Sequence, residues 1–321
     1  MEKLISVICP TYNEESYIES ILSFFVNSKP ENKELLIIDG GSSDRTKEIV
    51  QGWILKNNNI KLFINLNKIV PYALNLGIKE SKGDFLIRID AHTKYSDDYF
   101  IKILEVFERT GADIVGGPTR VAFETDFQKA VAVAITNPLG VGDSKVHNLE
   151  YNGYSDHVTF GAWKREIFDE VGLFDEELVR NQDDEFHYRA KSKGKNIYLS
   201  SAIKLWYYPR KEFPSLFKQY FQYGYYKPLV LTKVRSEIKL RHLIPSFFTF
   251  YILSVPIAFF YLVWIFPAII YLLAISFAIL KSDLNSYQKL ISFLVYPAIH
   301  LGYGFGFILG MKKILKKNNE K

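Results

Sequence analysis

Short apolar runs alternate with amphipathic stretches over most of the first 240 residues of this 321-residue chain. The apolar runs are rich in Ile, Val, Leu and Phe and are bounded by turn-forming residues, which is typical of strands buried in a parallel sheet. The expected strands are residues 4–9, 35–39, 60–65, 85–90 and 113–116.

Three helices are expected between these strands. In two of them the apolar residues recur every three or four positions and form one face, namely Ile18, Ile21, Leu22 and Phe25 within residues 15–28, and Phe100, Ile103, Leu104 and Phe107 within residues 97–109. The third, residues 44–57, begins at a capping candidate, Ser43 or Asp44. The series predicts an open α/β fold with a mostly parallel sheet, whose ligands bind outside the carboxyl ends of the strands.

The C-terminal part of the chain has a different character. Residues 243–280 carry no charge, and a membrane span needs about 20 apolar residues, so this run predicts two short helices with a turn at residues 264–267. Residues 290–311 form a second run without Asp, Glu, Lys or Arg. We expect it to be a further span, or a re-entrant segment because of Pro297 and four glycines. A buried helical core of a soluble domain is the alternative, which the length of the first run disfavours.

These features divide the chain into four expected segments. They are an α/β domain (residues 1–230), a basic linker (231–242), two or three membrane helices (243–311) and a basic tail (312–321). Basic residues flank both ends of the apolar region, which favours an even number of crossings, whereas the count of apolar helices is three. No signal peptide is expected, because residues 4–9 are too short for one. We therefore expect a multi-pass protein of the cell membrane with a cytoplasmic α/β domain.

Charge and cysteine content narrow the classes of function. The 40 Lys and Arg against 35 Asp and Glu give a net charge of +5, which is spread too thinly for nucleic acid to be the main partner. The single cysteine, Cys9, cannot form an intramolecular disulfide, which excludes a disulfide-stapled extracellular fold.

Polar residues gather at the ends of three expected strands. The sequence PTYNE (residues 10–14) follows the first strand, DGGSSDRT (39–46) ends the second and DAH (90–92) ends the fourth. These residues should converge on one crevice, although Asp39 and Asp44, each taken alone, could be turn and N-cap residues. Asp90 and His92 are alternate residues, which an extended backbone points the same way, so they could hold one divalent cation unless the pair is incidental.

These motifs are followed by an acidic patch further along the chain. Their order and spacing over residues 4–230 resemble those of the inverting glycosyltransferases of family 2, which have the Rossmann-like GT-A fold. Asp90-Ala91-His92 and the segments 207–210 and 219–224 are most similar to the membrane-tethered, succinoglycan-biosynthesis type. The resemblance implies an enzyme that transfers a hexosyl unit with inversion from a nucleoside-diphosphate sugar, a UDP-sugar in the first instance. The implied acceptor is a lipid-linked saccharide in polysaccharide or glycan biosynthesis.

The resemblance also implies a nucleotide-sugar pocket and a divalent cation, Mn²⁺ or Mg²⁺. The implied pocket residues are Pro10, Thr11, Tyr12, Asn13, Glu14, Asp39, Asp44 and Asp90. Asp39 would accept a hydrogen bond from the base, while Asp90 and His92 would hold the cation that neutralises the leaving diphosphate. His92 departs from the usual second Asp, which removes one negative charge and favours the softer Mn²⁺.

The acidic patch NQDDE (residues 181–185) implies the general base. Where the family carries Glu-Asp, this chain has Gln182-Asp183, so Asp183 is the implied base that takes the proton from the acceptor hydroxyl. Asp184 and Glu185 are rivals. The alternative for the whole cluster is a solvated acidic helix start, which the helix dipole favours.

Five residues are implied to lie near the acceptor or the diphosphate: Gly161, Ala162, Trp163, Arg210 and Gln219. Trp163 could stack on a sugar or could be packed in the core. Gln222 replaces the Arg of the Gln-x-x-Arg segment of processive relatives, which weakens the case for a polymerase, although Lys227 could supply that charge.

Other classes of protein fit less well. A nucleotidyltransferase would need a glycine-rich phosphate loop near the first strand, and a Rossmann dehydrogenase would need G-x-G-x-x-G there. A transferase that acts directly on a polyprenyl phosphate remains an alternative. A catalytically impaired membrane scaffold is another, because two catalytic motifs are altered.

Overall fold

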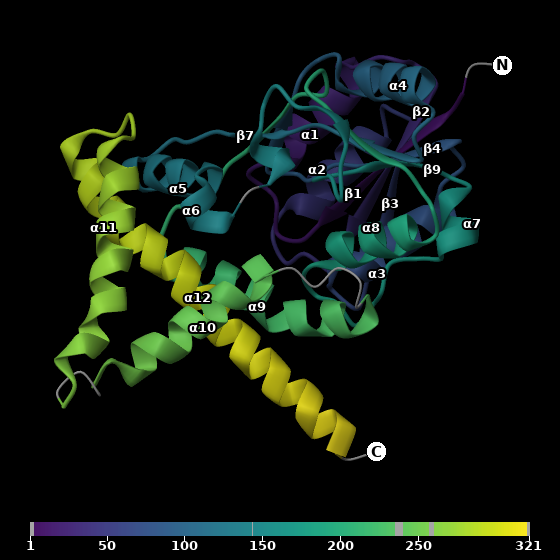
Figure 1. Cartoon of the computed structure of the whole chain (residues 1–321). Helices are drawn as coiled ribbons and strands as arrows, with labels where there is room; N and C mark the ends of the chain where they lie inside the picture. The colour runs from purple at the N-terminus through teal and green to yellow at the C-terminus, as the bar shows by residue number, and fades with distance from the viewer. Residues whose placement is uncertain (1–2, 143, 235–239, 257–259, 320–321) are drawn as a thin grey trace. The chain divides into compact units, whose positions relative to one another are not determined.

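The computed structural model describes residues 3–142, 144–234, 240–256 and 260–319 (Figure 1). It divides into two compact units. Unit 1 comprises Met1–Arg120 and Lys145–Tyr207, and unit 2 comprises Val121–Ser144 and Tyr208–Lys321. This division differs from the expected boundary at residue 230. Part of the expected linker and of the apolar run, namely residues 235–239 and 257–259, lies outside the described residues, as do residues 320 and 321 of the basic tail.

Unit 1 is built on an eight-stranded sheet with the strand order β3-β2-β1-β4-β9-β6-β10-β8. Antiparallel pairing is confined to β9 with β4 and β6, and to β8 with β10, so the mostly parallel sheet is confirmed. All five expected strands are present, with ends that differ by at most two residues. The strands are β1 (Ile5–Thr11), β2 (Lys33–Asp39), β3 (Ile60–Ile64), β4 (Phe85–Arg88), β6 (Ile114–Gly116), β8 (Asn152–Tyr154), β9 (Ala162–Lys164) and β10 (Ile197–Ser200).

Helices connect these strands, and the three expected ones are present as α1, α2 and α4. The position before α2 is Arg45, rather than Ser43 or Asp44, although the Asp44 carboxylate accepts the N–H of Thr46 at 3.0 Å. A second sheet has the order β5-β11-β7, formed by β5 (Thr93–Tyr95), β11 (Leu205–Tyr207) and β7 (Thr119–Val121). The helices of unit 1 are α1 (Ile18–Asn27), α2 (Thr46–Ile54), α3 (Val70–Glu80), α4 (Tyr99–Thr110), the 3₁₀ turn Lys145–His147, α7 (Ile167–Val171) and α8 (Gln182–Ser192).

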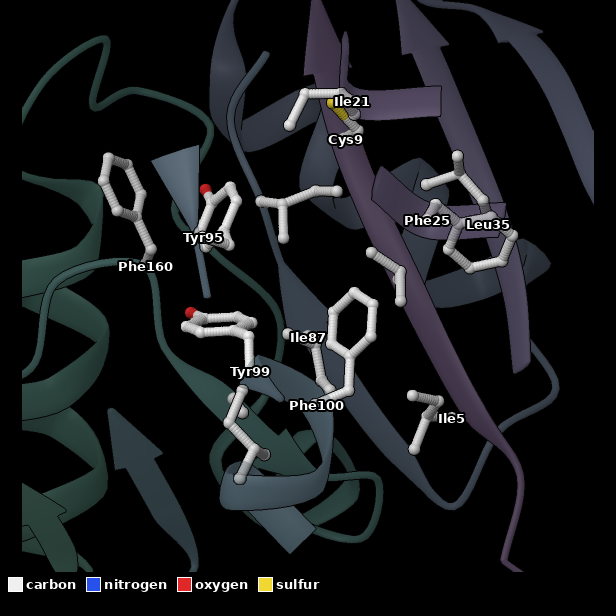
Figure 2. Close-up of a cluster of buried hydrophobic side chains, with 14 of the residues drawn as sticks. Ile5, Cys9, Ile21, Phe25, Leu35, Ile87, Tyr95, Tyr99, Phe100 and Phe160 are labelled. Atoms are coloured by element: carbon white, nitrogen blue, oxygen red, sulfur yellow. The ribbon is translucent and has the colours of Figure 1, made fainter. Parts of the chain in front are cut away.

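One hydrophobic core of unit 1 lies between the sheet and helices α1 and α4. The apolar face of α1, including Ile21 and Phe25, packs in the same cluster as Ile5 and Cys9 of β1 (Figure 2). Burial raises the pKa of the Cys9 thiol well above its usual range, so Cys9 is a neutral core residue. The same cluster includes Tyr95 and Phe160, both of which contact site residues described below.

Unit 2 is helical. Its elements are α5 (Asp126–Thr136), α6 (Pro138–Val141), α9 (Phe213–Lys233), α10 (Leu240–Ser254), the 3₁₀ turn η4 (Leu262–Ile265), α11 (Phe266–Leu280) and α12 (Ser286–Asn319). By length and composition, two helical stretches could cross a membrane, Leu262–Leu280 and Ser286–Lys316, and the apolar helix His242–Ser254 is shorter. The turn expected at residues 264–267 was placed too late, because α10 already ends at Ser254 and Pro267 lies in the first turn of α11, where proline is tolerated.

Helix α12 is continuous through Pro297 and all four glycines, so the re-entrant alternative is not what the structure has. The glycines instead allow close helix packing, because α12 runs against α9 and α10 (Figure 1). An added Cβ would lie 2.0 Å from the Phe221 carbonyl oxygen at Gly306, and 2.2 Å from that of Tyr225 at Gly310. Gln288 of α12 also donates to Asp126 of α5 at 2.7 Å, which ties residues 121–144 to this helical unit.

Candidate functional site

The loops after β1 and β2 are joined at the carboxyl edge of the sheet. Thr11 and Asp39 are partners in the strand register, and Gly40 donates its N–H to the Thr11 carbonyl at 2.8 Å. Beyond the strands, the N–H of Asn13 donates to Ser42 Oγ at 2.8 Å, and the N–H of Ser43 donates back to Asn13 Oδ1 at 2.9 Å. The two predicted nucleotide motifs therefore form one structure.

Asp39 organises this structure. Its side chain is fully buried, and its carboxylate accepts the N–H groups of Gly41 and Ser42 at 2.9 and 2.8 Å, as well as the Ser42 hydroxyl. These three bonds leave one of about four acceptor positions on the carboxylate. That Asp39 accepts a hydrogen bond from a base stays a prediction.

The other predicted pocket residues surround the joined loops. The buried hydroxyl of Thr11 has no hydrogen-bond partner within the described parts of the chain, and Tyr12 is 48% exposed with Lys68 Nζ 5.8 Å from its ring centre. Pro10 lies within β1, opposite Ile38. Asp44 accepts the N–H of Glu15 at 3.1 Å in addition to that of Thr46, so it stabilises the loops whether or not it also meets a ligand.

Asp90 and His92 lie in a turn, which the N–H of Thr93 closes by donating to the Asp90 carbonyl at 3.2 Å. The expected extended backbone was therefore wrong, because β4 ends at Arg88 and the chain folds back into β5. His92 Nδ1 lies 3.2 Å from Glu14 Oε1, so the turn contacts the loop after β1.

Arg88, the last residue of β4, connects the two predicted carboxylates. Its Nε and Nη2 donate to the two oxygens of Asp90 at 3.0 and 3.2 Å, and its Nη1 donates to both oxygens of Asp183 at 2.8 and 3.1 Å. Asp183 lies in the first turn of α8, 95 residues along the chain. Burial raises the pKa of Asp183, while the Arg88 charge opposes that rise. A carboxylate with a raised pKa is a better proton acceptor.

The rival acidic residues differ in their surroundings. Glu185 is buried and paired with Arg189, whose Nε and Nη2 donate to its carboxylate at 2.7 and 2.9 Å. Arg189 in turn donates to the carbonyls of Val171 and Leu173. The Glu185 carboxylate therefore stabilises the position of α8. Asp184, in contrast, is half-buried. The acidic cluster lies at the start of α8, but it is not the solvated cluster of the alternative, because Glu185 is buried. Asp183 is the member that Arg88 connects to Asp90.

Trp163 does not present a face to a sugar. It lies in β9 between β4 and β6, is 1% exposed and packs against Phe168, Phe174 and Phe186. The stacking prediction for Trp163 was wrong, because a side chain of a central strand points into the core. Ala162 is buried in the same strand, and the Gly161 carbonyl accepts the N–H of Arg88 at 3.1 Å, so this segment supports the site from within the sheet.

Arg210, Gln219 and Lys227 belong to unit 2, so their proposed roles stay predictions. Arg210 is exposed before α9, and Lys227 is buried on α9. Gln219, also on α9, donates to Tyr223 Oη at 3.0 Å.

The donor set fits a divalent cation that is shared with a ligand. Among the residues that the structure describes, no three His, Cys, Asp or Glu side chains gather closely enough to hold a metal ion by themselves. Mg²⁺-type sites commonly take one or two carboxylates and complete their shell with substrate phosphates and water. Asp90, His92 and the neighbouring Glu14 provide oxygen and nitrogen donors of this kind.

The sequence analysis missed two site residues, Arg88 and Tyr95. The hydroxyl of Tyr95 accepts the N–H of Asp90 at 2.8 Å. The signal for Arg88 was available, since a charged residue inside the apolar strand FLIRID must have a buried partner.

Comparison with known proteins agrees with this geometry. Residues 6–172 match the model of the family described as glycosyl transferase family 2. The succinoglycan biosynthesis protein ExoA of Rhizobium meliloti is 35% identical over 243 residues, which is 74% of this chain and 73% of the relative. The chain belongs to glycosyl transferase family 2. The predicted family is therefore confirmed.

Further relatives of this family 2 glycosyltransferase extend the picture. A dolichyl N-acetyl-alpha-D-glucosaminyl phosphate 3-beta-D-2,3-diacetamido-2,3-dideoxy-beta-D-glucuronosyltransferase of Methanococcus voltae is 32% identical over 78% of this chain and 80% of the relative. Among solved structures, a mannosyltransferase from Pyrobaculum calidifontis in complex with GDP-Man and Mn²⁺ superposes with a TM-score of 0.63 at 14% identity, covering 94% of this chain and 87% of the other. The likeness shows the fold, which is the predicted GT-A fold.

Proposed function

We propose that this family 2 enzyme is anchored in the membrane and transfers a hexosyl unit, with inversion, from a nucleoside-diphosphate sugar to a lipid-linked saccharide. The reaction would take place at the cytoplasmic face, as a step of polysaccharide or glycan biosynthesis. A UDP-sugar is the donor proposed first, and GDP-sugars are the next class to test.

The observation that carries the proposal is the meeting of Asp90 and Asp183 on the guanidinium of Arg88. One carboxylate follows the strand beside the joined loops, and the other opens a helix that comes much later in the chain. An inverting displacement needs a donor-side anchor and a base that accepts the proton of the acceptor hydroxyl. In the proposal, Asp183 is that base, since its burial favours proton uptake.

The joined loops support a nucleotide site. They offer the Thr11 hydroxyl, which has no hydrogen-bond partner among the described residues, the half-exposed Tyr12 ring and the Lys68 ammonium at the carboxyl edge of the sheet. Asp90 and His92 would hold a divalent cation, Mn²⁺ or Mg²⁺, which when bound neutralises charge on the leaving diphosphate. Mn²⁺ is the ion in the Pyrobaculum mannosyltransferase structure.

Two observations support a lipid-linked acceptor at a membrane. The helical stretches Leu262–Leu280 and Ser286–Lys316 have the length and composition of spans. The Methanococcus relative is named for a dolichyl-linked saccharide substrate. Confinement to the surface that holds a lipid acceptor raises its effective concentration.

The test is a donor screen with membranes that contain the full chain. UDP- and GDP-hexoses would be supplied with Mn²⁺ or Mg²⁺, and both released nucleoside diphosphate and labelled lipid product would be measured, with Asp183→Asn membranes as the control. Product on a lipid-linked saccharide supports the proposal, whereas product on polyprenyl phosphate alone supports the carrier-forming alternative. Nucleotide binding without turnover of any donor would support a scaffold instead.

A further inference from the structure

Arg88 is surrounded by groups that use most of its hydrogen-bonding capacity. Four donor–acceptor contacts of 2.8 to 3.2 Å join it to Asp90 and Asp183, and its guanidinium carbon lies 5.3 Å from the centre of the Phe160 ring. Its side chain is only 7% exposed. These surroundings therefore hold the guanidinium in one orientation.

The shape of the guanidinium sets the angle between the two carboxylates. The group is planar, and its N–H groups point outward in a fixed fork, so Asp90 on one edge and Asp183 on another are held at a set separation. A lysine ammonium carries the same charge but lacks the fork, so it could neutralise both carboxylates without fixing their directions.

Phe160 and the strand backbone hold the fork in turn. The N–H of Arg88 donates to the Gly161 carbonyl, and Phe160 just before it adopts a left-handed backbone with φ 48°. A bulky residue rarely takes that conformation, and such strain is typical of functional sites. The left-handed residue adjoins the strand that holds the arginine.

We infer that Arg88 is a positioning residue, which aims the carboxylate of Asp183 at the acceptor hydroxyl and holds Asp90 on the donor side in one rigid unit. This inference rests on the proposed function, in which Asp183 is the base. Arg88 would not touch substrate. It would act on transfer by aiming Asp183, whereas on nucleotide binding only its charge would act, by neutralising Asp90.

A purely structural ion pair is the alternative, and it makes different predictions for a lysine. If only charge neutralisation mattered, Arg88→Lys would restore both nucleotide binding and transfer. If positioning matters, we expect Arg88→Lys to keep the Kd for UDP within about threefold of wild type, measured with and without Mn²⁺, while kcat falls at least tenfold.

The decisive experiment is a double-mutant cycle in the full chain in membranes, with single-turnover transfer as the readout. We expect Arg88→Gln and Asp183→Asn each to lower the transfer rate at least 30-fold. In the Asp183→Asn background, Arg88→Gln should lower it by less than about threefold more, because the group that Arg88 aims is already lost. Losses that multiply would overturn the inference, as would full rescue of transfer by Arg88→Lys.

The variants also answer the objection that Arg88→Gln cannot fold. That change leaves two partly buried carboxylates without their cation, whereas Arg88→Gln with Asp183→Asn removes one charge of each sign. The double variant should therefore melt at a higher temperature than Arg88→Gln, and Arg88→Lys keeps the charge throughout. Wild type that transfers no sugar would overturn the proposed function, whereas active wild type with multiplying losses would overturn only the role of Arg88.

Discussion

His92 Nδ1 and Glu14 Oε1 lie 3.2 Å apart, so the turn after β4 and the loop after β1 meet through an imidazole and a carboxylate. Replacing the imidazole with a second carboxylate, in His92→Asp, sets two like charges against each other. We expect a lower Tm in excess chelator and a larger rise in Tm with Mn²⁺ or Mg²⁺ than wild type shows, since a divalent cation would neutralise the pair. Transfer should survive, with a changed preference between the two metals.

The matched control for this prediction is His92→Asp combined with Glu14→Gln. Removing one of the two charges should restore the Tm in chelator and reduce the response to metal. A Tm of His92→Asp that does not respond to either cation would show that no cation binds at this contact.

Substitutions of three neighbouring acidic residues test which of them is the general base. Asp183→Asn keeps the shape and removes the proton acceptor, so we expect a loss of about 100-fold or more in kcat with nearly unchanged nucleotide binding. Asp184→Asn should retain most of the activity. Glu185→Gln should lower the Tm but leave kcat nearly unchanged, because Glu185 is paired with Arg189. Full activity of Asp183→Asn together with loss in Asp184→Asn would place the base one residue later.

Helix packing predicts opposite effects of one substitution at two glycines, Gly52 in unit 1 and Gly306 in unit 2. Alanine is a better helix former than glycine by about 1 kcal/mol. At Gly52 of α2 an added Cβ meets nothing within 4 Å, so Gly52→Ala should raise the Tm. At Gly306 the Cβ would lie 2.0 Å from a backbone carbonyl, so Gly306→Ala should lower the Tm despite the helix propensity. Thermal unfolding in detergent measures both, and a raised Tm for Gly306→Ala would contradict the close approach of α12 to α9.

Two histidines, the buried His187 and the partly buried His147, predict a loss of stability in mild acid. Burial lowers the pKa of His187 to about 3 and that of His147 to about 4. In the unfolded chain these histidines bind protons when the pH falls below the ordinary histidine pKa of about 6.5, whereas in the folded chain they stay neutral in mild acid. The free energy of unfolding should therefore fall as the pH drops from about 6.5 towards 4, by up to about 1.4 kcal/mol per pH unit for each histidine.

His187→Leu isolates one of these contributions. Neither ring nitrogen of His187 has a hydrogen-bond partner among the described residues, so an apolar side chain loses no bond there. The Tm of the variant, followed from pH 7 to pH 4.5, should depend less steeply on pH than that of wild type. Equal slopes would mean that His187 is protonated in the folded protein.

The sequence predicted those parts of unit 1 whose pattern repeats over several residues. The five expected strands are long apolar runs, and they are present because burial on both faces of a parallel sheet requires such runs. The three-residue strands β5, β7 and β11 are too short to show periodicity. The turn at Asp90 and the burial of Trp163 depend on strand neighbours that lie far away in sequence, which a local pattern does not contain.

The boundary between the two units is another feature that a local sequence pattern does not predict. Helix α9 is amphipathic and aromatic, and its own pattern does not indicate that it packs against glycines 81 to 85 residues further along the chain. A protein cut at residue 241, within the expected basic linker, would lack α12, against which both α9 and α5 pack. Pairings between distant helices therefore decide where this chain can be divided.

The reciprocal hydrogen bonds that join Asn13 to the Ser42 hydroxyl oxygen and to the Ser43 N–H have a thermodynamic consequence for ligand binding. Loops that are already tied to each other lose little conformational entropy when a nucleotide arrives, so a small number of contacts suffices for a given affinity. Association with this edge of the sheet should then show a small heat-capacity change, set by the surface of the nucleotide alone rather than by the ordering of loops.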